Sequence, residues 1–248
     1  MDGKTIVLDG VNIGTGAYLR RTDAYGSLPV VALSVTDILD IPSILARVVS
    51  IANIREECPT LSALCVRNDS MSPEMFASAA YAASGLWDGA LILHTSSSEC
   101  AEAAFDALDG RKAIIGPADI SCIDNMAEVA SRCNVPMIVK SADISELMDL
   151  AERAELAGVN DIILDPDAVN MKRCLESCTD IRRLMTERNL SQASHPVAVR
   201  SWSGEYAVAV SAVAVLRYAS LLIIDDLDAD SCRVLDILAH SAVPVLYS

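Results

Sequence analysis

The sequence of 248 residues has few aromatic residues, few lysines and a strong excess of acid. Aromatic residues make up 4% of the chain, so Val, Ile, Leu and Ala have to fill its core. Lysine occurs only as Lys4, Lys112, Lys140 and Lys172, and the formal net charge is -15. Nucleic acids and anionic bilayers both require basic surfaces, so this charge argues against either as a partner.

Several motifs are also missing. The eight cysteines form no CxxC pair, which argues against the usual zinc and iron–sulfur ligand spacings. No GxGxxG and no P-loop occur, and no Ser/His/Asp arrangement stands out. The N-terminus lacks the basic and apolar segments of a signal peptide, and no apolar run reaches the ~18 residues of a membrane helix. We therefore expect a cytoplasmic protein with reduced thiols, no membrane association and no cofactor bound covalently or through a motif.

Apolar segments of strand length alternate with helical segments about eight times along the chain. The clearest unit is Gly158–Asn170, in which the apolar residues 162–164 form a buried strand, Asp165 ends it and Pro166 breaks it. Successive parallel strands need helical crossovers of this kind, and ~250 residues is a common length for one α/β barrel. The pattern predicts an α/β fold, with a single (β/α)8 TIM barrel over residues 1–248. A doubly wound open sheet is the alternative, weakened by the missing GxGxxG.

Both ends of the chain carry additional features. Residues 4–8 alternate in polarity, Asp9-Gly10 is a turn signal and Val11–Ile13 returns, which predicts an N-terminal β-hairpin within a hairpin and lead-in loop of residues 1–27. Strand Lys112–Ile115 is expected to end before a Gly116-Pro117 turn. The apolar run Val243–Tyr247 is either an extra strand or a packing segment.

In barrels of this type, functional residues lie at the C-terminal ends of the strands. Polar or turn residues occupy these ends, although solvent exposure alone also places charges there. They are Asp37, Arg67, Asn68, His94, Gly116-Pro117, Lys140, Asp165, Arg200, Trp202, Asp225 and Asp226. From this set, and with Glu205 assisting, we expect Asn68, Lys140, Asp165 and Arg200 to hold a small ligand such as a pterin. Lys140 either pairs with a carboxylate such as Asp165 or, less favoured, forms a Schiff base.

Segments in the expected order resemble one known family. They are LPVVALSVTDILDI with RVVSIA, LCVRN, DGALILHTSSSE, RKAIIGPADISCIDNMAEVASRCNVPMIVKSADISEL, AGVNDIILDP and HPVAVRSWSGEYAVAVSAVAVLRYASLLIIDD. Together they resemble the TIM-barrel part of the large (gamma) subunit of the corrinoid iron–sulfur protein. That protein belongs to the acetyl-CoA decarbonylase/synthase system of methanogens and acetogens. The iron–sulfur and corrinoid domains of that subunit have no counterpart in this sequence.

The resemblance implies a barrel subunit in corrinoid-dependent one-carbon metabolism, in which methyl groups pass between a tetrahydropterin, cobalt and acetyl-CoA synthase. The implied partners are a corrinoid protein or a second TIM-barrel subunit, with a homodimer as a further arrangement. A tetrahydropterin, or a partner's corrinoid acting in trans, is the implied cofactor. The alternative is a stand-alone, pterin-binding enzyme similar to methyltransferases, with its site at the C-terminal end of the barrel.

Overall fold

A computed structural model describes residues 3–14, 28–201, 207–217 and 219–245, with side chains up to residue 240. The described strands are β1 (Thr5–Leu8), β2 (Val11–Gly14), β3 (Val30–Thr36), β4 (Leu61–Arg67), β5 (Ala90–His94), β6 (Ile114–Ala118), β7 (Met137–Lys140), β8 (Ile162–Asp165), β9 (Ala198–Ser201) and β10 (Leu221–Ile224). The helices are α1 (Ile41–Glu57), α2 (Pro73–Ser84), α3 (Ser98–Ala107), α4 (Ile123–Cys133), α5 (Ile144–Leu156), α6 (Met171–Glu187), α7 (Ala207–Leu216) and α8 (Ala229–Val245), with a short 3-10 helix, η1 (Gln192–Ser194).

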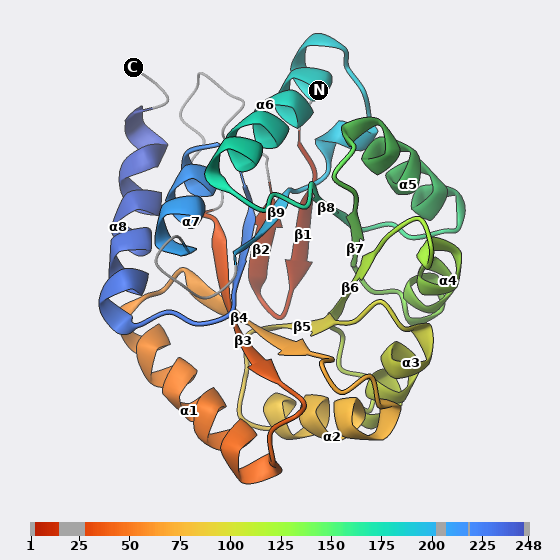
Figure 1. Ribbon diagram of the computed structural model, residues 1–248, viewed down its shortest axis with the longest axis vertical. Helices are drawn as coiled ribbons and strands as arrows, with labels where there is room; N and C mark the ends of the chain where they lie inside the picture. Colours follow the sequence, from red (N-terminus) through yellow and green to blue (C-terminus); the bar gives the residue numbers. More distant parts are fainter. Residues whose placement is uncertain (1–2, 15–27, 202–206, 218, 246–248) are drawn as a thin grey trace.

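Eight parallel strands form a closed barrel. Their order is β8-β7-β6-β5-β4-β3-β10-β9 (Figure 1). A parallel bridge between Leu164 and Val197 joins β8 to β9, and the amide of Leu164 donates to the carbonyl of Pro196 at 2.8 Å. The predicted (β/α)8 barrel is therefore confirmed, and the open sheet is excluded.

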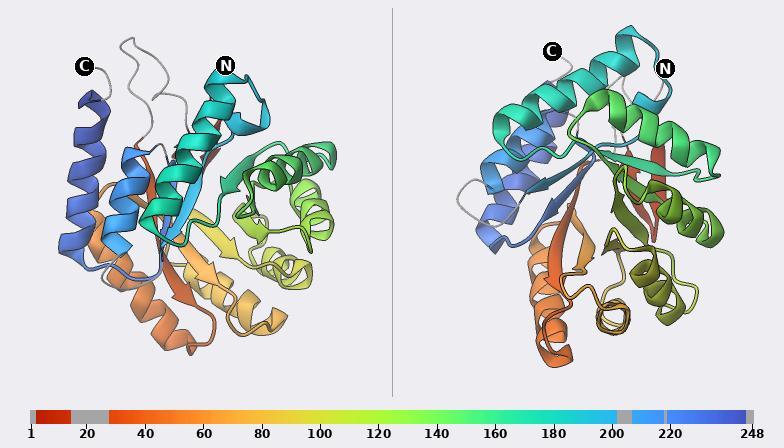
Figure 2. Two further views of the ribbon diagram at one scale, coloured as in Figure 1. Left: turned by 45° about the horizontal axis from the view of Figure 1, so that its top comes forward. Right: turned by 45° about the vertical axis from the view of Figure 1, so that its right-hand side comes forward.

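The helices cover the outside of the strands, as Figure 2 shows. Every second residue of a strand points outward, and residues such as Leu33 and Leu91 pack there against helical residues such as Ile44 and Phe76. Side chains at the N-terminus of several helices accept backbone hydrogen bonds, as Asp40 does from the amide of Ser43 at 3.0 Å. These caps hold the start of the capped helices close to the C-terminal end of the preceding strand.

The N-terminal hairpin closes one end of the barrel. Its turn places Asp9 and Gly10 at φ values of 48° and 76°, which suit the tight turns of β-hairpins. Its apolar side chains pack with the inward-facing residues of all eight barrel strands; they are Ile6, Leu8, Val11 and Ile13. The amide of Lys4 also donates to the carbonyl of Ser194, just before β9, at 2.7 Å. The hairpin therefore fills the N-terminal end of the barrel, as Figure 1 shows at the centre of the ring.

Three sequence expectations differ from the structure or fall outside it. The strand expected at Lys112–Ile115 lies at Ile114–Ala118, so Gly116 and Pro117 are within β6, at an irregularity in its pairing with β7. A Cβ atom on Gly116 would lie 2.6 Å from the carbonyl oxygen of Ile138, which explains the glycine. The expectation of an extra strand at Val243–Tyr247 is wrong for residues Val243–Val245, which belong to α8. A closed barrel offers no free edge to which such a strand could be added. The lead-in loop at 15–27 lies outside the described residues.

Candidate functional site

The two-residue period of the strands carries polar residues to the C-terminal mouth, the end of the barrel where the strands finish. Apart from Ser34 on β3, the inward-facing residues are apolar through the barrel, such as Cys65 on β4, Ile138 on β7 and Ile163 on β8. Continuing the same period to the strand ends places these side chains inside the mouth: Thr36, Arg67, His94, Lys140, Asp165, Arg200 and Asp225. One period therefore explains both the largely apolar barrel interior and its charged mouth.

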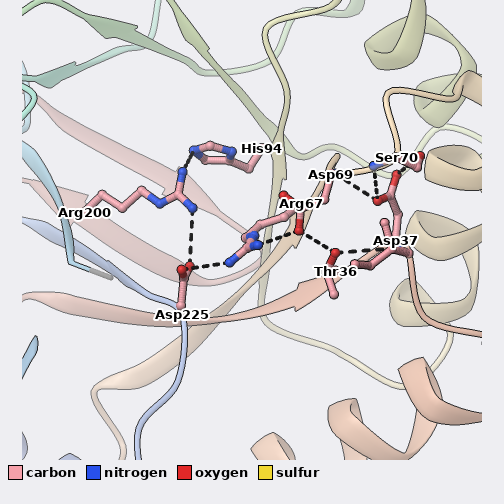
Figure 3. A network of polar contacts seen from close by, with 9 residues as sticks. Thr36, Asp37, Arg67, Asp69, Ser70, His94, Arg200 and Asp225 are labelled. Atoms are coloured by element: carbon pink, nitrogen blue, oxygen red, sulfur yellow. Dashed lines mark hydrogen bonds and ion pairs between the residues drawn. The ribbon is translucent and has the colours of Figure 1, made fainter. Parts of the chain in front are cut away.

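Arg200 spans this mouth. It starts on β9, and its Nη1 lies 2.8 Å from Nε2 of His94 on β5 (Figure 3). In the closed order of eight strands, β9 and β5 stand opposite each other. The Arg200 side chain therefore crosses the mouth and divides it into two halves.

The half next to β3, β4 and β10 is filled by an ion network, defined here as Arg200, Asp225, Arg67 and Asp69. Asp225 accepts from Arg67 Nη1 at 2.8 Å and from Arg200 Nη2 at 3.4 Å. Arg67 also pairs with Asp69, whose carboxylate accepts from the hydroxyl of Thr36. Each carboxylate in the network binds a donor on a neighbouring strand, so this half of the mouth is held together by its own side chains (Figure 3).

Asp37 has a structural role beside this network. Its side chain is 1% exposed. One carboxylate oxygen accepts from the amides of Asp69 and Ser70, each at 2.9 Å, and the other accepts from the Ser70 hydroxyl at 2.6 Å. These bonds position the β4–α2 loop, and they account for Asp37 without a ligand.

His94 is neutral in this setting. Burial, with the positive charge of Arg200 as the next cause, lowers the pKa of His94 to about 3. A guanidinium only donates hydrogen bonds, so Nε2 of His94 is the acceptor and its ring proton is on Nδ1. An imidazole with this pKa cannot serve as a general base near neutral pH, and its role is to position Arg200.

The other half of the mouth contains a cavity of about 80 Å³. We call it the mouth cavity; its lining residues are His94, Pro117, Lys140, Asp165, Asp167, Ala168, Val169 and Arg200. Typical pockets for drug-sized ligands begin at roughly 300 Å³. The mouth cavity therefore suits a chemical group of a few heavy atoms better than a large ligand.

Asp165 is the buried acid of the mouth cavity. It is 6% exposed, and Oδ1 accepts from the amide of Asp167 at 2.9 Å. Its other oxygen accepts no hydrogen bond from any described residue. Burial, opposed in part by that backbone bond and by Lys140 and Arg200, raises the pKa of Asp165 to about 6. Titration near neutral pH is typical of functional carboxyl groups.

Lys140 pairs in register with Asp165, since the two residues end adjacent strands β7 and β8. The expected ion pair between them is absent, however. Within the described residues no carboxylate lies within 4.0 Å of the Lys140 ammonium group. Lys140 and the second oxygen of Asp165 thus remain available as a donor and an acceptor in one small cavity.

The remaining expected ligand residues are placed differently. Asn68 follows Arg67, so it has the opposite orientation; its Nδ2 donates to the Thr95 hydroxyl at 2.9 Å, and it does not line the mouth cavity. Its Oδ1 is buried without a partner among the described residues. Glu205 and Trp202 lie outside the described residues. The structure therefore brings together three of the five expected residues, Lys140, Asp165 and Arg200.

The ligand set expected from the sequence left out His94, Asp225 and Arg67, although all three were recognised as strand-end residues. The signal that separates them from Asn68 is the inward two-residue period. Asp167 and Val169 carry no such signal, because the loop after β8 brings them to the cavity.

Exposed apolar side chains surround the mouth. Each is 40–67% exposed and lies in a loop that follows a barrel strand, or in the first turn of the next helix. We call this set the apolar rim: Ile38, Leu39, Ile41, Met71, Met75, Ile120, Val169 and Met171. Large exposed apolar groups in one region mark surfaces that bind other molecules.

Features elsewhere in the described chain do not compete with the mouth as a catalytic site. Two larger grooves, of about 560 and 720 Å³, lie along outer helices, and neither is lined by any of the polar residues at the strand ends. No group of three or more His, Cys, Asp or Glu side chains among the described residues is arranged to hold a metal ion. No described helix is both long and apolar enough to cross a bilayer.

The sequence model of one family, the CO dehydrogenase/acetyl-CoA synthase delta subunit, matches residues 8–241. The chain belongs to this family. The match runs from the end of β1 into α8, so it includes the mouth and the apolar rim.

Two curated protein subunits are similar in sequence to this chain. The acetyl-CoA decarbonylase/synthase complex subunit gamma of Methanothermobacter thermautotrophicus is 33% identical over 132 residues, which cover 52% of this chain and 29% of that protein. The corrinoid/iron-sulfur protein large subunit of Moorella thermoacetica is 24% identical over 200 residues, covering 78% and 45%. The chain thus spans less than half the length of these relatives. The resemblance to the large subunit seen in the sequence is confirmed.

Solved structures with the same fold include dihydropteroate synthases. The Yersinia pestis DHPS with a pterine-sulfa conjugate superposes with a TM-score of 0.69 at 13% identity, covering 98% of this chain and 99% of that one. The Thermus thermophilus dihydropteroate synthase superposes with a TM-score of 0.65 at 18% identity, covering 96% of this chain and 99% of that one. At these identities, the likeness shows that the delta-subunit family chain shares their fold.

Proposed function

We propose that this chain is a barrel subunit of corrinoid-dependent one-carbon metabolism, related to acetyl-CoA synthesis or cleavage, and that it docks a corrinoid-bearing protein on its C-terminal face. Family membership supports the metabolic assignment. One relative is the large subunit of a corrinoid/iron-sulfur protein, and another is a subunit of an acetyl-CoA decarbonylase/synthase complex. These relatives motivate the choice of partner.

The observation that carries the docking assignment is Arg200, which crosses the mouth to His94. With Asp225 and Arg67 it fills half of the mouth, and a cavity of only about 80 Å³ remains in the other half. A catalytic barrel needs its mouth open to substrate, whereas this one presents a largely filled polar centre. Such a face is suited to contact another surface.

The apolar rim gives that surface its binding energy. Protein interfaces combine an apolar contact area with polar groups that fix orientation. Here the apolar groups stand on loops after β3, β4, β6 and β8, so they surround the polar centre on several sides. Methionine side chains such as Met71 and Met75 adapt readily to a partner's shape.

The test is a binding titration between this chain and the corrinoid-bearing protein encoded in the same organism. Ile120→Glu places a charge in the apolar rim, where the wild-type residue is 55% exposed. Ile237→Glu is the matched control, because Ile237 is 65% exposed on α8, outside the rim. Docking on the rim predicts at least tenfold weaker binding for Ile120→Glu, about 1.4 kcal/mol, and little change for the control.

Equal affinities for both variants would place the contact elsewhere, and no binding by the wild type would remove the proposal. The same titration against a second TIM-barrel subunit, and a measurement of the chain's own mass in solution, cover the other partners that the sequence suggests. A cytoplasmic location stays a prediction.

A second candidate function is a pterin-binding enzyme similar to methyltransferases. Two acceptors without a partner among the described residues favour it: the buried Oδ1 of Asn68 and the second oxygen of Asp165. The fold neighbour from Yersinia pestis is a complex with a pterine-sulfa conjugate. As expected from the sequence, Lys140, Arg200 and Glu205 are the further ligand residues, and Arg200 has to move away from His94 to make room for a bicyclic ring. Titration with a tetrahydropterin tests it: Asn68→Ala and Asp165→Ala should each abolish binding, and unchanged affinity in both would exclude it.

A further inference from the structure

We propose that the mouth cavity binds a primary carboxamide group, –CO–NH2, presented by the docking partner. The inference rests on the proposed function, because it names the chemical group that the mouth would accept when a partner covers the apolar rim. The two larger grooves between the outer helices lack a comparable convergence of buried donors and acceptors.

Charge balance selects a neutral ligand. The charged side chains that line the cavity are two cations, Lys140 and Arg200, and two carboxylates, Asp165 and Asp167. An anion placed there would face both carboxylates at short range, and a cation would face both basic groups. Because burial strengthens these interactions, a dipolar group without net charge is favoured over either ion.

The available hydrogen-bonding groups select an amide among neutral ligands. The second oxygen of Asp165 accepts no hydrogen bond from a described residue, and the residue is only 6% exposed. Lys140 donates to no carboxylate within the described chain. Asp165 lines the cavity, so a ligand that donates to this oxygen forms a charge-assisted hydrogen bond, which is stronger than a bond between neutral groups. A carboxamide offers an N–H to Asp165 and a C=O to Lys140.

The size of the cavity agrees with this assignment. About 80 Å³ accommodates a group of a few heavy atoms, and a bicyclic ring would have to displace Arg200. Ala168, Val169 and Pro117 supply the apolar part of the lining, which suits the methylene carbons that carry such an amide. Two sources present this chemistry: the peripheral carboxamides of a corrin ring, and the Asn or Gln side chains of a protein.

The test uses matched small probes in ligand-observed NMR titrations with the full chain. Propionamide, propionate, propylammonium and N,N-dimethylpropionamide share their carbon chain and differ in charge or in N–H groups. At pH 7.5 propionamide should bind at least tenfold more tightly than the other three. Asp165→Asn, which turns a donor toward the amide, and Lys140→Met should each reduce that affinity at least fivefold. Asp226→Asn, which alters a carboxylate outside the cavity, is the control.

The pH dependence provides a separate readout. Burial raises the pKa of Asp165 to about 6, so lowering the pH from 7.5 to 5.5 should weaken propionamide binding about fourfold as the acceptor is protonated. The charged or titratable groups around Asp165 are Lys140 on β7, Arg200 on β9, Asp167 on its own loop, His94 on β5 and Cys178 on α6. His94 stays neutral across this range because burial lowers its pKa to about 3. A ligand carboxylate would show the opposite trend, since it needs the protonated acid.

The source of the amide is decided by two corrins. Cobinamide carries peripheral carboxamides, and cobyrinic acid has carboxyl groups in their place. If cobinamide competes with propionamide and cobyrinic acid does not, the amide belongs to the corrin. Propionamide binding without such competition assigns it to a protein side chain, and the cavity assignment stands in both cases.

Equal binding of propionamide and propionate, or full affinity in both Asp165→Asn and Lys140→Met, would overturn the inference. The proposed function fails separately. If wild-type chain binds propionamide but no corrinoid-bearing protein, docking is wrong and the amide site stands. If it docks but does not discriminate among the small probes, the amide site is wrong and docking stands.

Discussion

Asp225 holds together the two arginines that fill the mouth, so its neutralisation should destabilise the chain. It accepts from Arg67 at 2.8 Å and from Arg200 at 3.4 Å, and its side chain is 11% exposed. The substitution Asp225→Asn keeps the size of the side chain and one acceptor oxygen. It removes the negative charge and turns an NH2 group toward a guanidinium.

The magnitude follows from what each arginine retains. A hydrogen bond to a charged group contributes ~1.5–3 kcal/mol, and breaking a fully buried ion pair costs ~3–5 kcal/mol. Arg67 still has Asp69, and Arg200 still has His94, so neither becomes an isolated charge. We therefore expect a loss of about 2–4 kcal/mol, which corresponds to roughly 4–16 °C in Tm for a chain of this size.

The neighbouring residue provides a matched control. Asp226 is 66% exposed and pairs with Arg47 at 2.6 Å, and exposed ion pairs contribute about 0–1 kcal/mol. Urea unfolding of both variants at pH 7.5 gives the comparison. A loss for Asp225→Asn no larger than that for Asp226→Asn would refute the view that the ion network stabilises the mouth.

Three further predictions concern the hairpin and the two perturbed side chains. Ile13 is 0% exposed in the barrel end and Val7 is 66% exposed on the same hairpin, so Ile13→Ala should cost about 2–5 kcal/mol in urea unfolding and Val7→Ala less than about 0.5 kcal/mol. Burial raises the pKa of Asp165 from 3.8 to about 6, so between these pH values the folded chain keeps a proton that the unfolded chain releases. The stability that this proton contributes to the fold is lost as pH rises through 6. The free energy of unfolding of Asp165→Asn should then exceed that of the wild type by about 1–3 kcal/mol at pH 7.5 and equal it at pH 4. A difference that stays constant between the two pH values would contradict this. Burial lowers the pKa of His94 from 6.5 to about 3, so below pH 6.5 the unfolded chain binds a proton that the folded chain does not. The contribution of His94 to stability is therefore full above pH 6.5 and is lost as pH falls toward 3. His94→Gln, which keeps an acceptor for Arg200, should reduce the loss of stability between pH 6.5 and 4, and an unchanged slope would show that His94 is not responsible.

Local patterns in the sequence predicted much of the architecture. The turn Asp9-Gly10 between alternating residues predicted the hairpin, and the repeat of apolar strands and capped helices predicted the barrel. The error at β6 arose because Gly and Pro usually end a strand, whereas here they lie within it, where the pairing register shifts.

The candidate site could be predicted only in part. Lys140, Asp165 and Arg200 were identified because each ends a strand that the sequence delimits well. The ion pair expected between Lys140 and Asp165 is absent, since neighbouring strand ends fix backbone positions and leave long side chains several alternatives. Asn68 was grouped with them because adjacency to a strand end does not reveal on which side of the strand a residue faces.

By itself, the sequence determined the two-residue period that keeps the barrel interior apolar and places charges at the strand ends, because side-chain direction along a strand is a local property. It also determined the acidic surface and the segments shared with the delta-subunit family. Only the tertiary structure decided that Arg200 meets His94, 106 residues away in the chain, across the mouth. That contact exists because eight strands close into a ring, and closure sets which two strands stand opposite each other.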